Sequence, residues 1–158
     1  MGRSGIKWYI VLRGRFEHSI DDKGRISIPA RFRDVLKREY ASDQLVVTIF
    51  DSCLVAYPLA EWQALEQKMR NLSLLKKDVK FFLRYFYSGA VECSIDDHGR
   101  ILIPSQLREH AGLDREVVFV GVMKGFEIWD RGIWGEEFEK YRETFDEISE
   151  SIAEWMGS

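Results

Sequence analysis

The side chains best placed to do chemistry lie in a short acidic and basic segment that occurs twice. The segment reads SIDDKGRISIP at 19–29 and SIDDHGRILIP at 94–104. In each copy an arginine, Arg25 or Arg100, follows a turn made of aspartate and glycine. The guanidinium carries paired N–H donors that fit two phosphate oxygens or the O6 and N7 atoms of guanine. This pattern indicates recognition of a polyanion by a side chain that leaves a turn.

The repetition extends well beyond this segment and marks an internal duplication. A shift of 75 positions aligns residues 17–33 with 92–108, and eleven of these 17 pairs are identical. The two copies run from about 12 to 75 and from about 88 to 150. A repeat of this length indicates that the fold is built from two similar units.

Each copy predicts the same order of elements, ββαββα. Aspartate and glycine form a tight turn between two strands, because Gly accepts a positive φ and Asp bonds its own turn backbone. Proline then ends the second strand and suits the start of a helix. The turn and helix-start residues are Asp21, Gly24 and Pro29 in the first copy, and Asp96, Gly99 and Pro104 in the second. About 65 residues make little core alone, so we expect the halves to interlock.

Composition and charge narrow the class of protein. The net charge is −3, yet residues 1–38 hold ten Lys/Arg against four Asp/Glu (+6), and residues 131–158 hold three against eight (−5). A basic N-terminal third is compatible with a polyanion partner despite the low overall charge. Two distant cysteines, Cys53 and Cys93, indicate neither a disulfide framework nor a zinc site. The N-terminal apolar run is too short for a signal peptide, which predicts a cytoplasmic protein.

The turn that leads into R-I-x-I-P resembles the AbrB-like swapped-hairpin superfamily, and a longer match resembles the MraZ family. That match covers the chain from Arg13 to Trp155, through RGRFEHSIDDKGRISIPARFR, CLVAYPLAEW, SGAVECSIDDHGRILIPSQLREHAGL and FEIWD. The resemblance implies an α+β, mostly β fold, in which the halves interlock as a pseudo-two-fold swapped-hairpin barrel with flanking helices. It also implies a homo-oligomeric ring that binds short tandem DNA repeats upstream of the division and cell-wall gene cluster, including its own gene. Such a regulator would be nucleoid-associated and usually a repressor.

The same comparison divides the chain into four parts. Residues 1–10 precede the usual start of the family and form an extension for which disorder is one interpretation. Residues 11–75 form the first repeat, 76–87 a linking helical segment, and 88–158 the second repeat with an acidic C-terminal helix.

Seven basic residues are candidates for DNA contact: Arg25, Lys23, Arg13, Arg15, Arg33, Arg31 and Arg100. Lys23 is replaced by His98 in the second copy, and Arg31 by Gln106, so the basic residues gather in the first copy. We therefore expect the first turn to be the principal reading surface, with the second adding Arg100 or serving assembly. Two alternatives stay open. Arg25 could only pair with Asp21 to hold the turn, and Arg33 could lie on a solvated helix face.

Other functions are weighed against this hypothesis. His18, the paired aspartates and His98 suggest a metal site or a hydrolase as an alternative. The two copies place their histidines on opposite sides of the aspartates, so pairing the copies would not give equivalent ligand geometry. We expect no enzyme, metal, cofactor, membrane or small-molecule substrate. A second alternative is an antitoxin-like or assembly module that binds protein rather than DNA. The C-terminal helix carries a heptad-like apolar stripe, expected to pack on the body or a neighbouring chain: Trp134, Phe138, Tyr141, Phe145, Ile148, Ile152 and Trp155.

Overall fold

The computed structural model describes residues 11–157, so the N-terminal extension lies outside the described residues. The predicted order of elements is confirmed in both copies. The first copy contains β1 (Arg15–Ser19), β2 (Arg25–Ser27), α2 (Ala30–Val35) with the π-helical turn η2 (Leu36–Tyr40), β3 (Gln44–Phe50), β4 (Cys53–Pro58) and α3 (Leu59–Met69). The second contains β5 (Val91–Ser94), β6 (Arg100–Leu102), α5 (Ser105–Ala111), β7 (Glu116–Gly121), β8 (Phe126–Asp130) and α6 (Arg131–Trp155). Between them lie α4 (Lys77–Phe82) and η3 (Leu83–Tyr87).

The two copies exchange strands. An antiparallel six-stranded sheet has the order β1-β7-β8-β4-β3-β5, and a separate two-stranded ribbon joins β2 to β6. β1 of the first copy therefore pairs with β7 of the second, and β5 of the second pairs with β3 of the first. The halves interlock as predicted, in a mixed α/β fold with a mostly antiparallel sheet. Closure into a swapped-hairpin barrel stays a prediction.

The strands that flank each turn do not pair with each other as a regular hairpin, which corrects the local expectation. Around the first turn, β1 and β2 share only the isolated bridge between Ile20 and Ile26. They diverge because two short strands bury little apolar surface on their own. By crossing to the other copy, β2 and β6 place Ile26 and Ile101 in the core with 0% and 1% exposure.

The core is shared between the copies. Ile28 and Ile103 are fully buried and follow the two turns at equivalent positions. Phe32 of α2 stacks on Phe126 of β8, with ring centroids 5.1 Å apart. Each copy therefore supplies side chains to the same main core. A smaller cluster at the base of the α3–α4 arm is built mostly from the first copy and includes Val46, Trp62 and Phe86.

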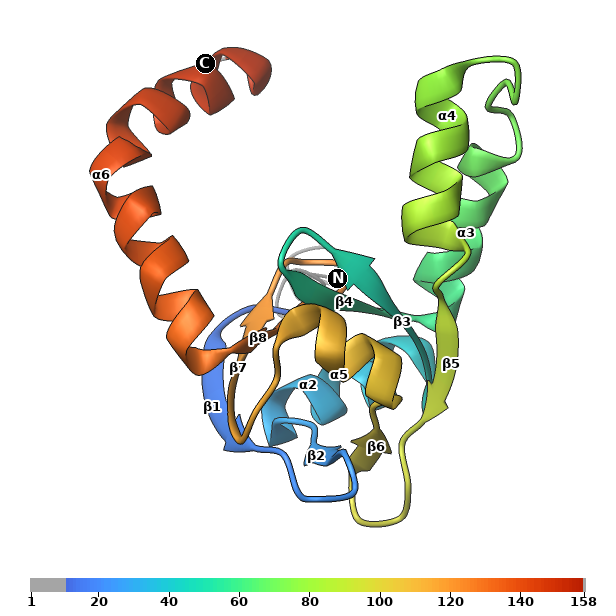
Figure 1. Cartoon of the computed structure of the whole chain (residues 1–158), viewed down its shortest axis with the longest axis vertical. Helices are drawn as coiled ribbons and strands as arrows, with labels where there is room; N and C mark the ends of the chain where they lie inside the picture. The colour runs from blue at the N-terminus through green and yellow to red at the C-terminus, as the bar shows by residue number, and fades with distance from the viewer. Residues whose placement is uncertain (1–10, 158) are drawn as a thin grey trace, which may run out of the picture.

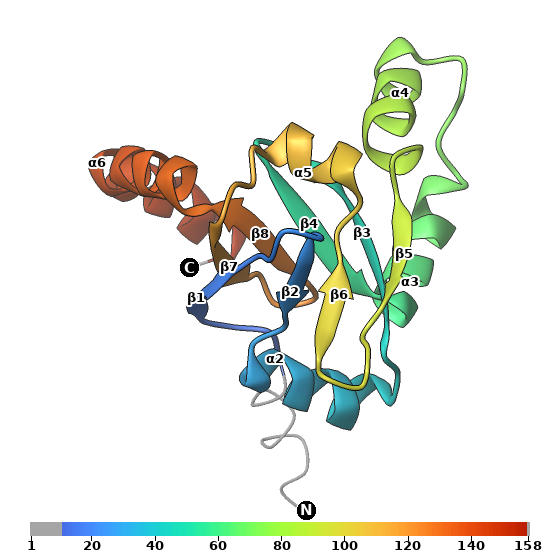
Figure 2. The same ribbon diagram turned by 60° about the horizontal axis from the view of Figure 1, so that its bottom comes forward.

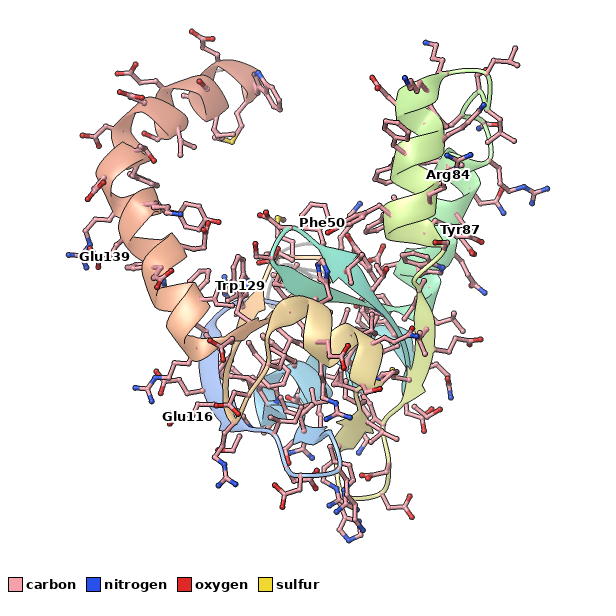
Figure 3. All side chains as sticks on the ribbon, in the orientation of Figure 1. Phe50, Arg84, Tyr87, Glu116, Trp129 and Glu139 are labelled. Atoms are coloured by element: carbon pink, nitrogen blue, oxygen red, sulfur yellow. The ribbon has the colours of Figure 1, made fainter. Side chains whose placement is uncertain are left out.

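Two helical arms leave the body on the side away from the turns (Figure 1). One is the pair formed by α3 with α4 and η3, and the other is α6. At the start of α6, the Asp130 carboxylate accepts a hydrogen bond from the Ile133 amide at 3.1 Å, which satisfies one of the free donors of a helix N-terminus. Trp134 packs on Trp129, with ring centroids 5.4 Å apart. Trp129 is labelled in Figure 3, near the start of this arm.

The apolar stripe of α6 packs on the body only at its beginning. Beyond Phe138 the stripe is exposed within the single chain and does not pack on the body, so its packing against a neighbouring chain stays a prediction. The exposed members are Tyr141, Phe145, Ile148, Ile152 and Trp155. The physical reason is the direction of α6, which runs away from the sheet, so that no helix or strand of residues 11–157 lies beside its outer half (Figure 1).

Candidate nucleic-acid interface

Each turn is organised by its first aspartate. Asp21 accepts hydrogen bonds from the Lys23 amide at 2.9 Å, the Arg25 amide at 2.8 Å and the Arg25 Nε at 2.8 Å. Asp96 accepts the matching bonds from the His98 amide at 2.8 Å, the Arg100 amide at 3.0 Å and the Arg100 Nε at 3.2 Å. In both copies the carboxylate thus holds the turn and the arginine together.

Both carboxyl groups are held in their charged form. The hydrogen bond from the Arg25 amide is the main reason that the pKa of Asp21 is lowered, and the Arg100 amide acts in the same way on the pKa of Asp96. A lowered folded-state pKa stabilises the turn above the ordinary pKa of aspartate, and this contribution is lost only as the pH falls through the lowered value. The turns are therefore held at neutral pH.

The pairing of Arg25 with Asp21 is observed, and it leaves part of the guanidinium available for another contact. Arg25 does pair with Asp21, and this ion pair uses only the Nε atom of the guanidinium. Within residues 11–157, the terminal nitrogens of Arg25 have no other hydrogen-bond partner. A partly exposed pair of this kind contributes about 0–1 kcal/mol to stability. Its clearer effect is to orient a guanidinium whose two terminal nitrogens remain as donors.

A second arginine pair crosses between the copies and covers the turns. Arg33 of α2 donates its Nε to the Ile28 carbonyl at 3.0 Å and lies against Gly99 of the other copy. Arg108 of α5 donates its Nε to the Ile103 carbonyl at 3.0 Å and lies against Gly24. Arg33 is exposed, but the Nε hydrogen bond and the contact with Gly99 hold its side chain against the turn of the other copy.

Backbone hydrogen bonds join the two turns into one surface. The Ile28 amide donates to the Gly99 carbonyl at 2.9 Å, and the Ile103 amide donates to the Gly24 carbonyl at 2.8 Å. Figure 2 shows the result, with β2 and β6 side by side between α2 and α5 and a turn at each end. The structure thus combines Lys23, Arg25, Arg33 and Arg100 in what we call the turn face, which comprises the two turns, the β2–β6 ribbon and the Arg33 and Arg108 side chains that lie against the turns.

Gly24→Ala is expected to lower the free energy of unfolding by about 1–3 kcal/mol, the usual cost of a side chain in a strained backbone conformation. Gly24 has φ of +89°, and an added Cβ would lie 2.8 Å from Arg108 Nε and 2.9 Å from the Ile103 carbonyl oxygen. Urea denaturation at fixed protein concentration measures the change. Gly135→Ala is the matched control, because Gly135 has open space around it within α6 and alanine favours a helix. Equal unfolding midpoints for Gly24→Ala and the unmodified chain would contradict this account of the turn.

The remaining candidates lie elsewhere. Arg15 is at the end of β1 away from the turn, where its guanidinium carbon is 4.8 Å from the centre of the Phe138 ring. Arg13 and Arg31 line a shallow hollow beside α2 together with Arg38. The seven predicted residues therefore fall into three places, and only four of them share the turn face.

Arg108 is a further residue at the candidate site that the sequence did not single out, since its crossing contact depends on the other copy. A signal was present in the sequence. Arg25/Arg100 and Arg33/Arg108 are the only basic pairs kept in both copies over the aligned 17–33 and 92–108 segments. The structure shows that both pairs act on the turns, one within its own turn and the other across the copies.

The described residues do not form the metal site considered as an alternative. The His18 ring stands edge-on to Phe119 at 5.4 Å, and burial, with a smaller effect of Arg33, lowers the pKa of His18. Across residues 11–157, no three His, Cys, Asp or Glu side chains gather so as to hold a metal ion. Cys53 and Cys93 are buried free thiols, and burial raises the pKa of Cys93 to about 11.

Comparison with known proteins matches two consecutive segments of the chain to one family. Residues 11–85 and 86–154 each match the model of a family described as MraZ protein and as antitoxin-like. The chain belongs to the MraZ family.

Curated members of the MraZ family match over nearly their whole length. A protein named Transcriptional regulator MraZ from Caldanaerobacter subterraneus subsp. tengcongensis is 44% identical over 142 residues, which are 90% of this chain and 96% of the relative. Relatives of the same name from Thermoanaerobacter pseudethanolicus and Moorella thermoacetica are each 46% identical and cover 91% and 92% of this chain, and 98% and 96% of their own lengths. A solution structure from Pyrococcus horikoshii is 15% identical over 74% of this chain and 87% of its own, and its TM-score of 0.30 is too low to support an argument.

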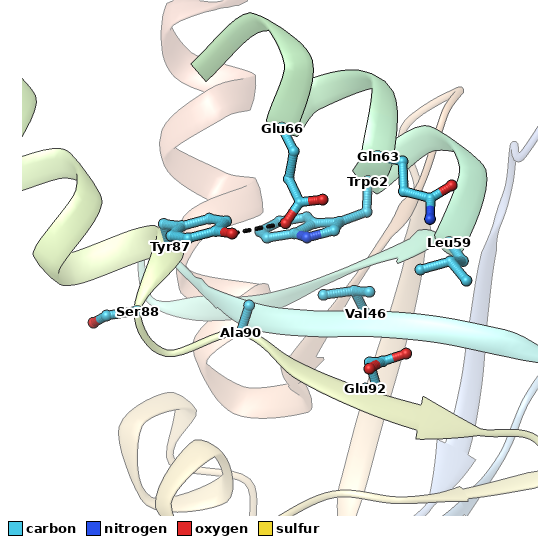
Figure 4. A pocket seen from close by; sticks show the side chains of 9 residues that line it. All are labelled: Val46, Leu59, Trp62, Gln63, Glu66, Tyr87, Ser88, Ala90 and Glu92. Carbon is cyan, nitrogen blue, oxygen red and sulfur yellow. Dashed lines mark hydrogen bonds between the residues drawn. The ribbon is translucent and has the colours of Figure 1, made fainter. Parts of the chain in front are cut away.

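This member of the MraZ family also has a hollow at the base of its α3–α4 arm (Figure 4). Trp62 and Tyr87 lie with parallel rings 5.8 Å apart, and the Tyr87 hydroxyl donates to Glu66 at 2.7 Å. That hydrogen bond is the main reason that the pKa of Tyr87 is raised. The lining includes Glu66 and Glu92 and no basic side chain, so this hollow does not suit an anion such as phosphate. None of the helices formed by residues 11–157 combines the length and the apolar character that a membrane span requires.

Proposed function

We propose that this chain is a sequence-specific DNA-binding transcription regulator. One observation carries the proposal. The two turns form a single face in which Asp21 orients Arg25 and Asp96 orients Arg100. A two-stranded β ribbon fits the major groove of B-DNA, and an arginine that leaves such a ribbon suits guanine or phosphate. The names of the relatives, Transcriptional regulator MraZ, support this function.

The distribution of charge supports the same orientation on DNA. The net charge of the chain is −3, and much of the negative charge belongs to residues 131–158, which carry a net −5. Most of these residues form α6, which leaves the body away from the turns (Figure 1). DNA bound at the turn face would therefore meet Lys23 and the arginines and stay distant from the acidic helix.

The proposed mechanism is multivalent. Chains associate into a ring-like homo-oligomer, and the ring binds tandem short repeats upstream of the division and cell-wall gene cluster, including its own gene. The exposed stripe of α6 supports self-association, because an apolar stripe at heptad spacing is typical of a helix interface. Several turn faces on one DNA raise the effective concentration of each later contact. A cytoplasmic, nucleoid-associated repressor of this kind blocks polymerase without catalysis.

Lys23→Ala is expected to reduce the salt dependence of DNA binding. Lys23 is exposed at the turn tip, where an ammonium can neutralise a phosphate. Each phosphate contact contributes a slope of about −0.9 to log K against log salt, so the variant should lose about one such unit per engaged chain. Fluorescence anisotropy on the DNA upstream of the gene, over a salt series, measures the slope. Lys124→Ala, an exposed lysine in the β7–β8 loop, is the matched control and should leave the slope unchanged. The same slope for Lys23→Ala and the unmodified chain would remove Lys23 from the interface.

A second candidate function is binding of a protein partner, which the antitoxin-like description of the family model favours. A protein partner would use the exposed apolar residues of the arms rather than the turn face. The salt series distinguishes DNA binding from protein binding, because a chain that binds only protein has no affinity for the DNA fragment even at low salt.

A further inference from the structure

The outer face of the β2–β6 ribbon carries four side chains in a fixed arrangement. Ile26 and Ile101 pair at its centre and point into the core. Because side chains alternate along a strand, the residues on either side of them point outward. Arg25 lies opposite Leu102, and Ser27 lies opposite Arg100. The outer face of the ribbon therefore presents two arginines at diagonal corners, with one apolar and one hydroxyl side chain at the others.

The pseudo-two-fold symmetry of this ribbon is broken at one pair of positions. The two arginines are equivalent, and so are the buried isoleucines. Ser27 and Leu102 are also equivalent by position, since the copies align with a shift of 75, yet one is a small polar residue and the other a large apolar one. Leu102 is 56% exposed. The fold does not need leucine here, because serine occupies the matching place in the other strand.

Base chemistry gives such a leucine a definite partner. In the major groove the thymine 5-methyl group is the apolar feature that side chains contact, and a bidentate arginine recognises guanine. Residues opposite each other on an antiparallel pair have Cβ atoms about 4.5–5.5 Å apart, so Arg25 and Leu102 reach neighbouring base pairs. Resting on the proposed DNA-binding function, we propose that Leu102 is a specificity-determining residue that contacts the methyl group of a thymine beside the guanine read by Arg25.

This contact makes the turn face directional. A two-fold symmetric protein surface reads a palindromic site, because each half of the protein sees the same bases. Here the Arg25–Leu102 end reads guanine and thymine, whereas the Arg100–Ser27 end reads guanine beside a base that serine does not select as strongly. Each chain therefore binds its site in one orientation, and successive chains bound along DNA require repeats that all run in the same direction.

Two exchange variants test the inference on the full-length protein. Selection of bound duplexes from a randomised DNA pool is carried out with the unmodified chain, with Leu102→Ser and with Ser27→Leu. We expect the unmodified chain to select a site with one thymine that Leu102→Ser no longer selects. Ser27→Leu is expected to add a second thymine at the position related by the local two-fold axis, which makes the selected site more palindromic. Size-exclusion chromatography and circular dichroism show whether each variant keeps its assembly and fold.

The chemical version of the test removes the methyl group from the DNA. Replacing that thymine with deoxyuracil in the selected duplex is expected to weaken binding of the unmodified chain about four-fold, the effect of one buried methyl group. The same replacement should leave binding by Leu102→Ser unchanged. Equal sensitivity of both proteins to deoxyuracil, or a change in oligomer size with no change in base preference, would overturn the role of Leu102. If the unmodified chain selects no sequence at all, the proposed DNA-binding function fails, and the two failures are thereby distinguished.

Discussion

Arg25→Ala is expected to abolish sequence-specific DNA binding and to leave the fold and the assembly intact. A bidentate arginine–guanine contact contributes about 1–3 kcal/mol of discrimination, which is roughly five- to 150-fold in affinity for one site. Because several chains act together in the proposed mechanism, the loss is multiplied along the DNA. Stability should change little, because the Arg25 side chain is 36% exposed and its ion pair with Asp21 is a partly exposed one.

Two further variants sharpen this prediction. Arg25→Lys keeps the charge and loses the planar fork, so it should retain nonspecific binding and lose sequence preference. Arg100→Ala removes the equivalent arginine of the second copy and tests whether both ends of the ribbon read bases. Binding by anisotropy, circular dichroism and oligomer size are measured together. An Arg25→Ala protein that unfolds or disassembles would show that the Asp21–Arg25 pair is mainly structural.

Replacing Phe145 and Ile152 of α6 with serine is expected to disrupt self-association. Their side chains are 62% and 43% exposed in the single chain, so the substitutions remove apolar contact area without touching the core. With the ring lost, affinity for tandem repeats should fall by about 10²–10⁴-fold, the usual gain from linked binding sites. Affinity for a single repeat should change little, because α6 lies away from the turn face (Figure 1). Analytical ultracentrifugation and anisotropy on one-repeat and multi-repeat DNA measure the two effects.

The control for this experiment is a pair of substitutions on the charged side of the same helix, Glu139→Gln and Glu143→Gln. These should preserve the oligomer, since both glutamates are exposed and lie outside the apolar stripe. An oligomer that survives the Phe145 and Ile152 substitutions would contradict the assembly role of α6 and direct attention to the α3–α4 arm.

The order of strands and helices can be predicted from the duplicated sequence, but the pairing of the strands cannot. The periodicity of RISI and the turn residues predict local strands, and both copies have them where expected. The partners of those strands cannot be derived in the same way, because β1 and β2 are near neighbours in sequence and nevertheless pair with β7 and β6. The reason is energetic and nonlocal, since only exchange between the copies buries Ile26 and Ile101 together.

The contacts within each turn can be derived from the sequence, whereas the contacts between distant parts of the candidate site cannot. Asp21 and Arg25 are close in sequence, so their contact follows from turn geometry alone. The contacts of Arg33 with Gly99 and of Arg108 with Gly24 depend on how the two copies are placed relative to each other. Local sequence patterns do not encode that placement. Arg15 belongs to the same basic stretch in sequence, but its contact with Phe138 is set by the path of α6, more than a hundred residues later.

The most direct test of the central claim is binding of the full-length chain to the DNA upstream of its own gene, at low salt, with the repeats intact or scrambled. The account predicts a discrete complex with the intact fragment, its loss when the repeats are scrambled, and its loss with Arg25→Ala on the intact fragment. A chain that shows no shift on the intact fragment at low salt, or that binds intact and scrambled repeats equally, would contradict the assignment of the turn face as a sequence-reading DNA surface.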